Sequence, residues 1–386
     1  MRRLFSFVLL LVLLVPTGAS AQEPELSDEL AEEVSRQLSG TDLSAWEEYA
    51  AELSEALGKR GLSAAGLVEL IAEGAAENAP QSIFEAVKRI AAAELKGAAA
   101  PIALLTICSL LTSLSGVAAR GRTKELLSFL LCGTALTATA AMLSSLAGMA
   151  ATAVENAGDI ASKSAPILTA LLISSGSGAE ASALRPLMGF LTETVVIAVQ
   201  RLLLPAALAS GVLALLDPLT PGGRLQRLVS LIRSVVKWCL GLLTTFFVGC
   251  AAVTGMTSAS RDGVSIRTAR YALDRLVPIV GNMVSGTVDS VMSCGLLIRS
   301  GAGVVTLLIL ILVLAGPLAV LASGIFVFRA SAALSAPAAD PAAVRLLSGA
   351  ADTAELLFAC AAASGCMLAV ICFMFISSGG TAAGLW

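Results

Sequence analysis

The sequence of 386 residues contains no histidine. This absence removes the commonest general base, the Ser-His-Asp arrangement of hydrolases and most zinc chemistry. Aromatic residues make up only 4% of the chain and charged residues only 14%. No strongly basic patch with interleaved aromatic residues occurs, so nucleic acid is not predicted as a partner.

The chain also lacks a Cys-x-x-Cys pair, although it has eight cysteines. All eight lie in apolar segments after residue 96: Cys108, Cys132, Cys239, Cys250, Cys294, Cys360, Cys366 and Cys372. Isolated cysteines in such segments usually pack as small hydrophobic residues. We therefore predict no metal site, no cofactor and no redox role.

Apolar residues dominate instead, at 56% of the chain, with a mean hydropathy of +0.87. This composition is typical of a polytopic membrane protein. Residues 22–96 contain 16 acidic and 6 basic residues, a net charge of −10, whereas residues 97–386 contain 12 acidic and 17 basic residues, a net charge of +5. The predicted fold class is all-α, with a polytopic transmembrane helical bundle preceded by a small helical head.

Residues 1–21 have the features of a secretory signal peptide. Arg2 and Arg3 precede a short apolar run, and Ala19-Ser20-Ala21 forms a small-residue cleavage site. An uncleaved membrane anchor is the alternative, although the apolar run is short for a span. In both cases the acidic head at residues 22–96 is predicted to lie outside the cytoplasm.

Two capping boxes, and apolar residues at helical spacing, predict four short helices in the head. The boxes are Ser44 with Glu47, and Ser82 with Glu85. A segment of about 75 residues with few large apolar side chains buries only a small core. The head is therefore either a module that docks on a partner or a solvated acidic cap, and both interpretations stay open.

The membrane domain at residues 97–386 contains six runs long enough to cross a bilayer. They are Ala98 to Ala119, Leu126 to Ala153, Leu187 to Leu216, Trp238 to Thr257, Val304 to Phe328 and Ala354 to Ser377. A seventh apolar segment, Ile160 to Ser182, is interrupted by Lys163, Pro166 and a Ser/Gly run. It is either a broken or re-entrant helix or an ordinary short span, so six or seven spans are predicted.

Basic residues between the runs predict the orientation. Arg120, Arg122 and Lys124 indicate a cytoplasmic loop. Residues Arg224 to Lys237 are basic on one face and apolar on the other, which predicts a helix lying in the cytoplasmic interface. Residues 258–296 are then expected on the outer side, as a partly inserted hairpin.

Few ionisable residues occur within the runs. Glu193 and Arg201 lie close to one helix face, and because an isolated charge in hydrocarbon is costly, this face is predicted to point into protein. A structural pair is favoured over a role in permeation. Pro205 is expected to kink the same helix.

The stretch from Ser265 to Leu296 is predicted to be helical and two-faced from end to end. Its apolar face is rich in leucine and valine, and Pro278 lies on the polar face. The remaining polar residues form what we call the polar stripe: Arg267, Arg270, Tyr271, Asp274, Asn282, Ser285 and Asp289. Such a stripe would line a lumen or contact a neighbouring subunit.

The same stretch belongs to a long motif at residues 254–291. The motif reads TGMTSASRDGVSIRTARYALDRLVPIVG from Thr254 to Gly281 and continues as NMVSGTVDSV. Its pattern contains Asp262, Gly263, Arg267, Thr268, Ala269, Pro278 and Gly281, followed by Thr287 and Asp289. Together with the signal peptide, the acidic head and the alanine-rich spans, the motif resembles the stage III sporulation protein AE family of endospore-forming bacteria.

The resemblance implies a multi-pass component of the mother-cell membrane around the forespore. It implies membership of the channel complex that links the mother cell to the engulfed forespore and is needed for late forespore development. The implied partners are other membrane proteins of the same sporulation operon and a forespore-side protein, in an oligomeric complex. The resemblance implies no catalytic residue.

Two other classes of function compete with this interpretation. A stand-alone secondary transporter or permease would place a midplane substrate site at the interruptions near residues 160–182 and Pro278. No convincing internal repeat supports it. A membrane enzyme would need a paired-aspartate or Ser-Lys site, and the spans offer no such constellation. We therefore expect a protein that is not an enzyme.

Overall fold

The computed structural model describes residues 47, 85, 87–90, 92, 101–105, 107, 122–174, 178–217, 225–276, 281–337 and 341–377. For residues 122–132, 174, 178–181, 183–184, 251–301, 373 and 375–377 it describes the backbone alone. This part of the chain is helical and contains no strand, which confirms the all-α prediction. The predicted signal peptide and nearly all of the head lie outside the described residues.

Six α-helices and one π-helix make up the body of the molecule. They are α7 (Arg122–Ser174), α8 (Gly178–Ile197), the π-helix η1 (Ala198–Leu203), α9 (Leu204–Leu216), α10 (Leu225–Leu276), α11 (Gly281–Ser335) and α12 (Pro341–Ser377). Five segments are long and apolar enough to cross a membrane: Gly133–Ile173, Arg185–Leu216, Leu225–Cys250, Ala302–Ser335 and Pro341–Cys372. They overlap five of the six predicted runs, which confirms a polytopic helical bundle. Most of the remaining run, residues 98–119, lies outside the described residues.

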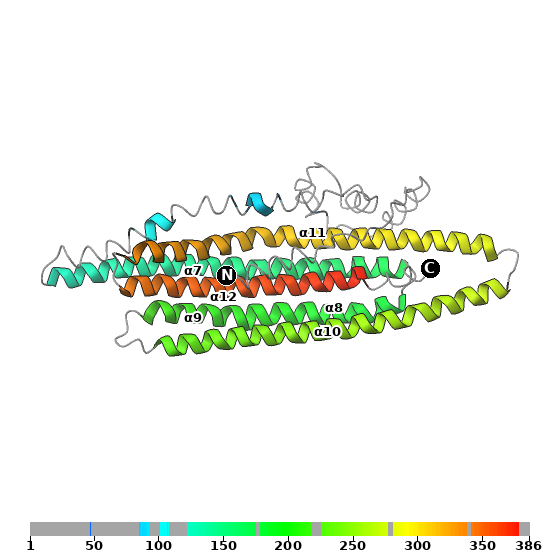
Figure 1. The fold of residues 1–386 in the computed structure, drawn as a ribbon, viewed down its shortest axis with the longest axis horizontal. Coiled ribbons are helices and arrows are strands. Elements are labelled where there is room, and N and C mark those ends of the chain that lie inside the picture. Colours follow the sequence, from blue (N-terminus) through cyan, green and yellow to red (C-terminus); the bar gives the residue numbers. More distant parts are fainter. Residues whose placement is uncertain are drawn as a thin grey trace.

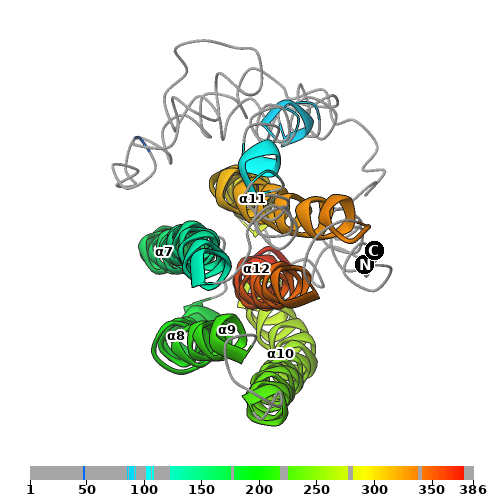
Figure 2. The same ribbon diagram turned by 90° about the vertical axis from the view of Figure 1, so that its left-hand side faces the viewer.

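The helices lie side by side along one long axis (Figure 1). Viewed along that axis, α12 is central, with α11, α7, the α8–α9 segment and α10 around it (Figure 2). In the apolar 18-residue window of the α12 segment 72% is buried, against 11% in that of the α10 segment. Because α12 is rich in alanine, glycine, serine and cysteine, neighbouring helices approach it closely without a hydrophobic driving force between them.

Close packing in the centre of the bundle uses glycine and cysteine. A methyl group added at Gly365 of α12 would lie 2.5 Å from the Cδ1 atom of Leu314 on α11, so the Leu314 side chain would have to shift for a larger residue. Cys360 and Cys372 of α12 are buried free thiols. The prediction that cysteines pack as small apolar residues is confirmed for these two.

For residues 160–182 the sequence left open a broken or re-entrant helix and an ordinary short span, and the structure shows no break at Lys163 or Pro166. Helix α7 is continuous to Ser174 and has Pro166 inside it, and α8 begins at Gly178. A proline removes only one backbone donor, and packing on neighbouring helices holds a long helix together in spite of this loss. Nearby, the Thr169 hydroxyl is 2.8 Å from the Ala165 carbonyl oxygen and 2.9 Å from that of Pro166, to which it can donate.

Pro205 has a different effect from the predicted kink in a regular helix. The turn before it widens into η1, and the N–H group of Leu204 donates to the Val199 carbonyl, five residues earlier. Pro205 lacks the N–H group that the Arg201 carbonyl would accept in an α-helix, so a π-helical turn suits this position. The chain then continues as α9.

The basic amphipathic segment at residues 224–237 does not form a separate helix, and its location in the membrane interface stays a prediction. Residues from Leu225 onward are the first turns of α10. Val229 and Val236 are buried in the bundle, whereas Trp238 is 70% exposed. The apolar residues therefore lie on two sides of the helix, because one side packs on protein and the other suits lipid.

The stretch that carries the polar stripe is divided between two helices. Helix α10 ends at Leu276 and α11 begins at Gly281, so a single helix does not cover residues 265–296. The adjoining ends of α10 and α11 extend beyond the corresponding ends of α7, α8 and α12 (Figure 1). This part is thus a projecting pair of helices, and its partial insertion into the membrane stays a prediction.

Candidate functional site

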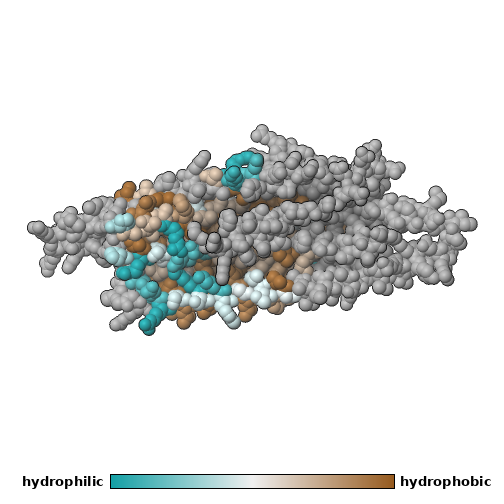
Figure 3. All heavy atoms as spheres, viewed as in Figure 1, coloured by the Kyte–Doolittle hydropathy of each residue, from teal (hydrophilic) through white to brown (hydrophobic). Residues whose placement is uncertain are grey.

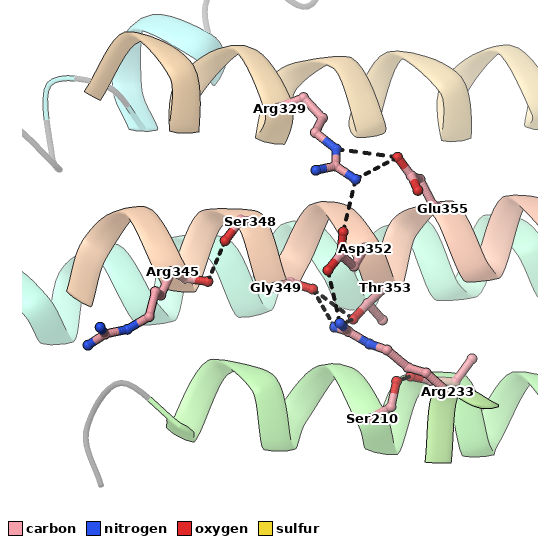
Figure 4. Close-up of polar contacts among 10 residues, drawn as sticks. Ser210, Arg233, Arg329, Arg345, Ser348, Gly349, Asp352, Thr353 and Glu355 are labelled. Atoms are coloured by element: carbon pink, nitrogen blue, oxygen red, sulfur yellow. Dashed lines mark hydrogen bonds and ion pairs between the residues drawn. The ribbon is translucent and has the colours of Figure 1, made fainter. Parts of the chain in front are cut away.

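Four charged side chains join three helices near one end of the apolar segments. Arg233 comes from α10, Arg329 from α11, and Asp352 and Glu355 from α12 (Figure 4). We call these four residues the charge cluster. Hydrophilic residues of the described part gather toward the end of the bundle where α10 and α12 begin (Figure 3).

Arg233 makes the most extensive contacts of the cluster. Its Nη1 atom donates to Asp352 Oδ2 at 3.0 Å, and its Nη2 atom donates to the Gly349 carbonyl at 2.8 Å and to Thr353 Oγ1 at 3.0 Å. Gly349, Asp352 and Thr353 lie within one turn of α12 and therefore on adjacent positions of its surface. The planar guanidinium group thus binds a whole turn of the neighbouring helix.

Arg329 binds the same turn from the other side. Its Nη2 atom is 2.9 Å from Asp352 Oδ1 and 2.8 Å from Glu355 Oε1, and its Nε atom donates to Glu355 at 3.3 Å. The two oxygens of Asp352 are consequently shared between the arginines of α10 and α11. Asp352 is the residue that links all three helices.

The charges of the cluster balance, with two guanidinium and two carboxylate groups. The side chain of Arg233 is only 16% exposed, whereas those of Arg329 and Asp352 are 45% and 42% exposed. A buried charge is tolerated when it is paired and hydrogen-bonded, and exposed pairs contribute less. The contact of Arg233 with Asp352 is therefore the energetically sensitive part of the cluster.

Helix α9 packs tightly beside the cluster. A methyl group added at Gly211 would lie 2.7 Å from Thr353 Cγ2 and 2.8 Å from Leu143 Cδ2 of α7. At Gly349 an added methyl group would meet Ala214 Cβ at 3.2 Å. The turn of α12 that binds Arg233 thus also contacts α9. Helices α9, α10, α11 and α12 therefore meet at this level, beside α7.

Arg233→Lys is expected to lower the stability of the bundle although it keeps the charge. A lysine ammonium group lacks the planar, fixed donor geometry with which the guanidinium group binds the Asp352 carboxylate, the Gly349 carbonyl and Thr353 Oγ1 together. Loss of hydrogen bonds to a charged group predicts destabilisation of about 2 kcal/mol. Thermal melting of the purified full chain in detergent measures this effect, and a melting temperature equal to that of the wild type would contradict the assigned contacts.

Comparison with known proteins decides the family. The model of the stage III sporulation protein AE family matches residues 62–379, which include all seven helices α7 to α12 and η1. The chain belongs to the stage III sporulation protein AE family. Stage III sporulation protein AE of Bacillus subtilis (strain 168) is 28% identical over 213 residues, which cover 55% of this chain and 52% of that protein. The chain thus spans about half the length of this curated relative. No solved structure matches the chain.

The family match includes the whole motif at residues 254–291. The motif positions and the polar stripe fall on the projecting ends of α10 and α11, and Pro278 lies between the two helices. Their side chains lie outside the described residues. The prediction that the stripe lines a lumen or a subunit interface therefore stays a prediction.

The prediction that Glu193 and Arg201 point into protein is wrong. Both side chains are exposed, on α8 and η1 respectively. Their neighbour Gln200 points inward, and its Nε2 atom donates to the Ala151 carbonyl of α7 at 3.3 Å. Buried valines, among them Val195 and Val199, hold the inner side of this segment. Glu193 and Arg201 consequently lie on the opposite side.

Sequence reasoning missed the charge cluster. Arg233 was counted among the residues of an interfacial helix, and Arg329, Asp352 and Glu355 were not singled out. One usable signal existed, because Asp352 stands just before an apolar run, Glu355 stands at its start, and Arg329 stands just after another run. Charges at matching ends of neighbouring spans are candidates for pairing.

Within the described part of the chain, no group of three or more histidine, cysteine, aspartate or glutamate residues could hold a metal ion. The carboxylates of the charge cluster face arginines. The arrangement can join helices.

Proposed function

We propose that this chain is a non-enzymatic membrane subunit of the channel complex that links the mother cell to the engulfed forespore. It would reside in the mother-cell membrane around the forespore and support endospore development. The observation that carries the proposal is the family match over residues 62–379, which coincides with a bundle of five membrane-crossing segments. The relative's name, stage III sporulation protein AE, supports the sporulation role only.

The form of the bundle supports a subunit of a larger assembly. Helices α10 and α11 have 52 and 55 residues, whereas about 20 residues cross the hydrocarbon of a bilayer. Their projecting ends therefore reach well outside the membrane, where they carry the family motif. The proposed partners for these ends, and for the acidic head at residues 22–96, are other membrane proteins of the same operon and a forespore-side protein.

The alternative of a stand-alone transporter has less support. It relied on interruptions near residues 160–182 and near Pro278, and α7 runs without a break through Lys163 and Pro166 to Ser174. The carboxylates of the charge cluster are engaged by arginines, which supports a structural role over acid–base chemistry.

Affinity purification from sporulating cells tests the proposal. The full chain with a C-terminal tag is expressed in an endospore-forming host from which the host's own copy has been deleted. We expect it to restore late forespore development and to co-purify, in mild detergent, with the other membrane proteins of the operon. A deletion strain that completes development, or a tagged chain that is isolated without those proteins, would refute the proposed function.

A further inference from the structure

The apolar runs of three helices end at one depth. The last charged residue before the run is Lys237 in α10 and Glu355 in α12, and the first charged residue after the run of α11 is Arg329. Arg329 and Glu355 form an ion pair, so they are level. Helix α10 runs parallel to α12 (Figure 1), and the Arg233–Asp352 ion pair makes Lys237 level with the start of the α12 run. The edge of the hydrocarbon therefore lies beside the charge cluster.

Three basic side chains lie at this edge or just outside it. Lys237 is at the edge, and the register set by the Arg233–Asp352 ion pair makes Arg227 of α10 level with Arg345 of α12 to within one residue. At 1.5 Å per residue, both arginines are about 10 Å outside the charge cluster. All three side chains are exposed, and none forms an ion pair within the described part of the chain. We call Arg227, Lys237 and Arg345 the basic band.

The positive charge of the basic band is not balanced by protein groups around it. The charge cluster is neutral, because its two guanidinium groups pair with two carboxylates. Outside the cluster, Asp217 is the acidic side chain that the structure describes at this end of α9, α10, α11 and α12. Three positive charges against one negative charge leave a net charge of +2. Hydrophilic side chains extend across the bundle at this end (Figure 3).

Trp238 lies at the same edge. It follows Lys237 directly, is 70% exposed, and lies about three helical turns after Arg227, on the same outer side of α10. Beyond it, exposed Leu242 and Phe246 continue along the helix and suit lipid. Tryptophan collects at the boundary between hydrocarbon and headgroups because its ring is amphipathic. The basic band is therefore at the depth of the phospholipid headgroups.

We propose that the basic band binds the headgroups of anionic phospholipids. Phosphate groups are the anions present at this depth, and the long side chains of arginine and lysine reach them while their stems stay on the protein. A zwitterionic headgroup brings its own cation with the phosphate, so it does not balance the net charge of +2, whereas anionic headgroups do. The inference goes beyond the proposed function and does not depend on it.

Fluorescence of Trp238 tests the inference. The purified full chain with Trp46→Phe and Trp386→Phe keeps Trp238 as its single tryptophan. It is placed in nanodiscs of phosphatidylcholine that contain a small fraction of one spin-labelled lipid. This lipid is either phosphatidylglycerol, which is anionic, or phosphatidylcholine, with the same label high on the acyl chain. The ratio of the quenching by the two lipids measures how strongly the anionic lipid is enriched beside the basic band.

We expect phosphatidylglycerol to quench Trp238 at least about threefold more strongly than phosphatidylcholine at low salt, because each basic residue at the surface attracts the anionic lipid. At about 1 M salt, where the Debye length is about 3 Å, the two lipids should quench equally. The triple variant with Arg227→Gln, Lys237→Gln and Arg345→Gln should show equal quenching at low salt as well. The comparison of low and high salt needs no substitution in the band, so it remains decisive if the triple variant folds poorly.

A second triple variant is the matched control. Lys163→Gln, Arg185→Gln and Arg201→Gln remove the same charge from exposed positions on α7, α8 and η1, so this variant should keep the preference for phosphatidylglycerol. Equal quenching by the two lipids before any charge is removed, or a preference that high salt leaves unchanged, would overturn the inference. A preference that survives loss of the basic band, or that both triple variants lose equally, would overturn it too.

Discussion

Asp352→Asn is expected to destabilise the protein more than any other single substitution of a charged residue in the bundle. The change keeps the size of the side chain but leaves Arg233 and Arg329 without their shared carboxylate. Removing one partner of a buried pair costs about 3–5 kcal/mol, and partial exposure of Asp352 places the expected loss near the lower end of that range. The melting temperature should fall, and the contacts of α10 and α11 with α12 should loosen together.

Reaction of buried thiols measures this loosening. Cys360 and Cys372 are buried in α12 and should react with a fluorescent maleimide only when the bundle opens. Glu355→Gln is the matched control, because Glu355 pairs only with the half-exposed Arg329, and its expected cost is below about 1 kcal/mol. Equal melting temperatures for the two variants would show that Asp352 has no special linking role.

Gly211→Leu is expected to have an effect of similar size through packing alone. Even a methyl group at this position would lie 2.7 Å from Thr353 Cγ2 and 2.8 Å from Leu143 Cδ2, so these side chains or α9 itself must shift. Overpacking of a close contact typically costs about 1–3 kcal/mol, and a leucine should reach or exceed the upper value. Yield and melting temperature of the purified chain report the change.

The same substitution elsewhere is a strict control. Gly241→Leu lies on the exposed side of α10, where no atom approaches within 4 Å of an added methyl group. The free energy of unfolding of the Gly241→Leu variant is expected to stay within about 1 kcal/mol of the wild-type value, since leucine has a better helix propensity than glycine. If Gly241→Leu destabilised the protein as much as Gly211→Leu, the loss would come from added bulk and not from the α9–α12 contact.

The fold class and most spans could be predicted because they depend on local composition. A run such as Val304 to Phe328 is apolar throughout, and such a segment is stable only as a helix in a membrane. For residues 160–182 the sequence could not decide between a broken helix and a short span, and α7 continues through Lys163 and Pro166 to Ser174. Pro166 and Lys163 weaken a helix locally, but whether α7 continues depends on α8, α11 and α12 beside it.

The charge cluster could not be derived from helical periodicity. Arg233 and Asp352 are 119 residues apart, and periodicity tells which residues share a face but not which helix that face meets. The predicted inward face of Glu193 and Arg201 failed for a different reason. The cost of a charge in lipid predicted an inward face, yet the buried valines of α8 occupy that side, so the charges face outward.

If the five segments cross the membrane, consecutive connections between the helices lie on alternate sides of it. Single cysteines at Gly222, between α9 and α10, and at Ala338, between α11 and α12, are compared with cysteines at Gly176 and Ile279, in the connections at the opposite end. An impermeant thiol reagent is applied to intact protoplasts of a strain that expresses the full chain without its native cysteines. We predict that positions 176 and 279 react from one side of the membrane, and that positions 222 and 338 react only after the membrane is opened or only from the other side. Reaction of all four positions from the same side would contradict a bundle in which these five segments cross the membrane.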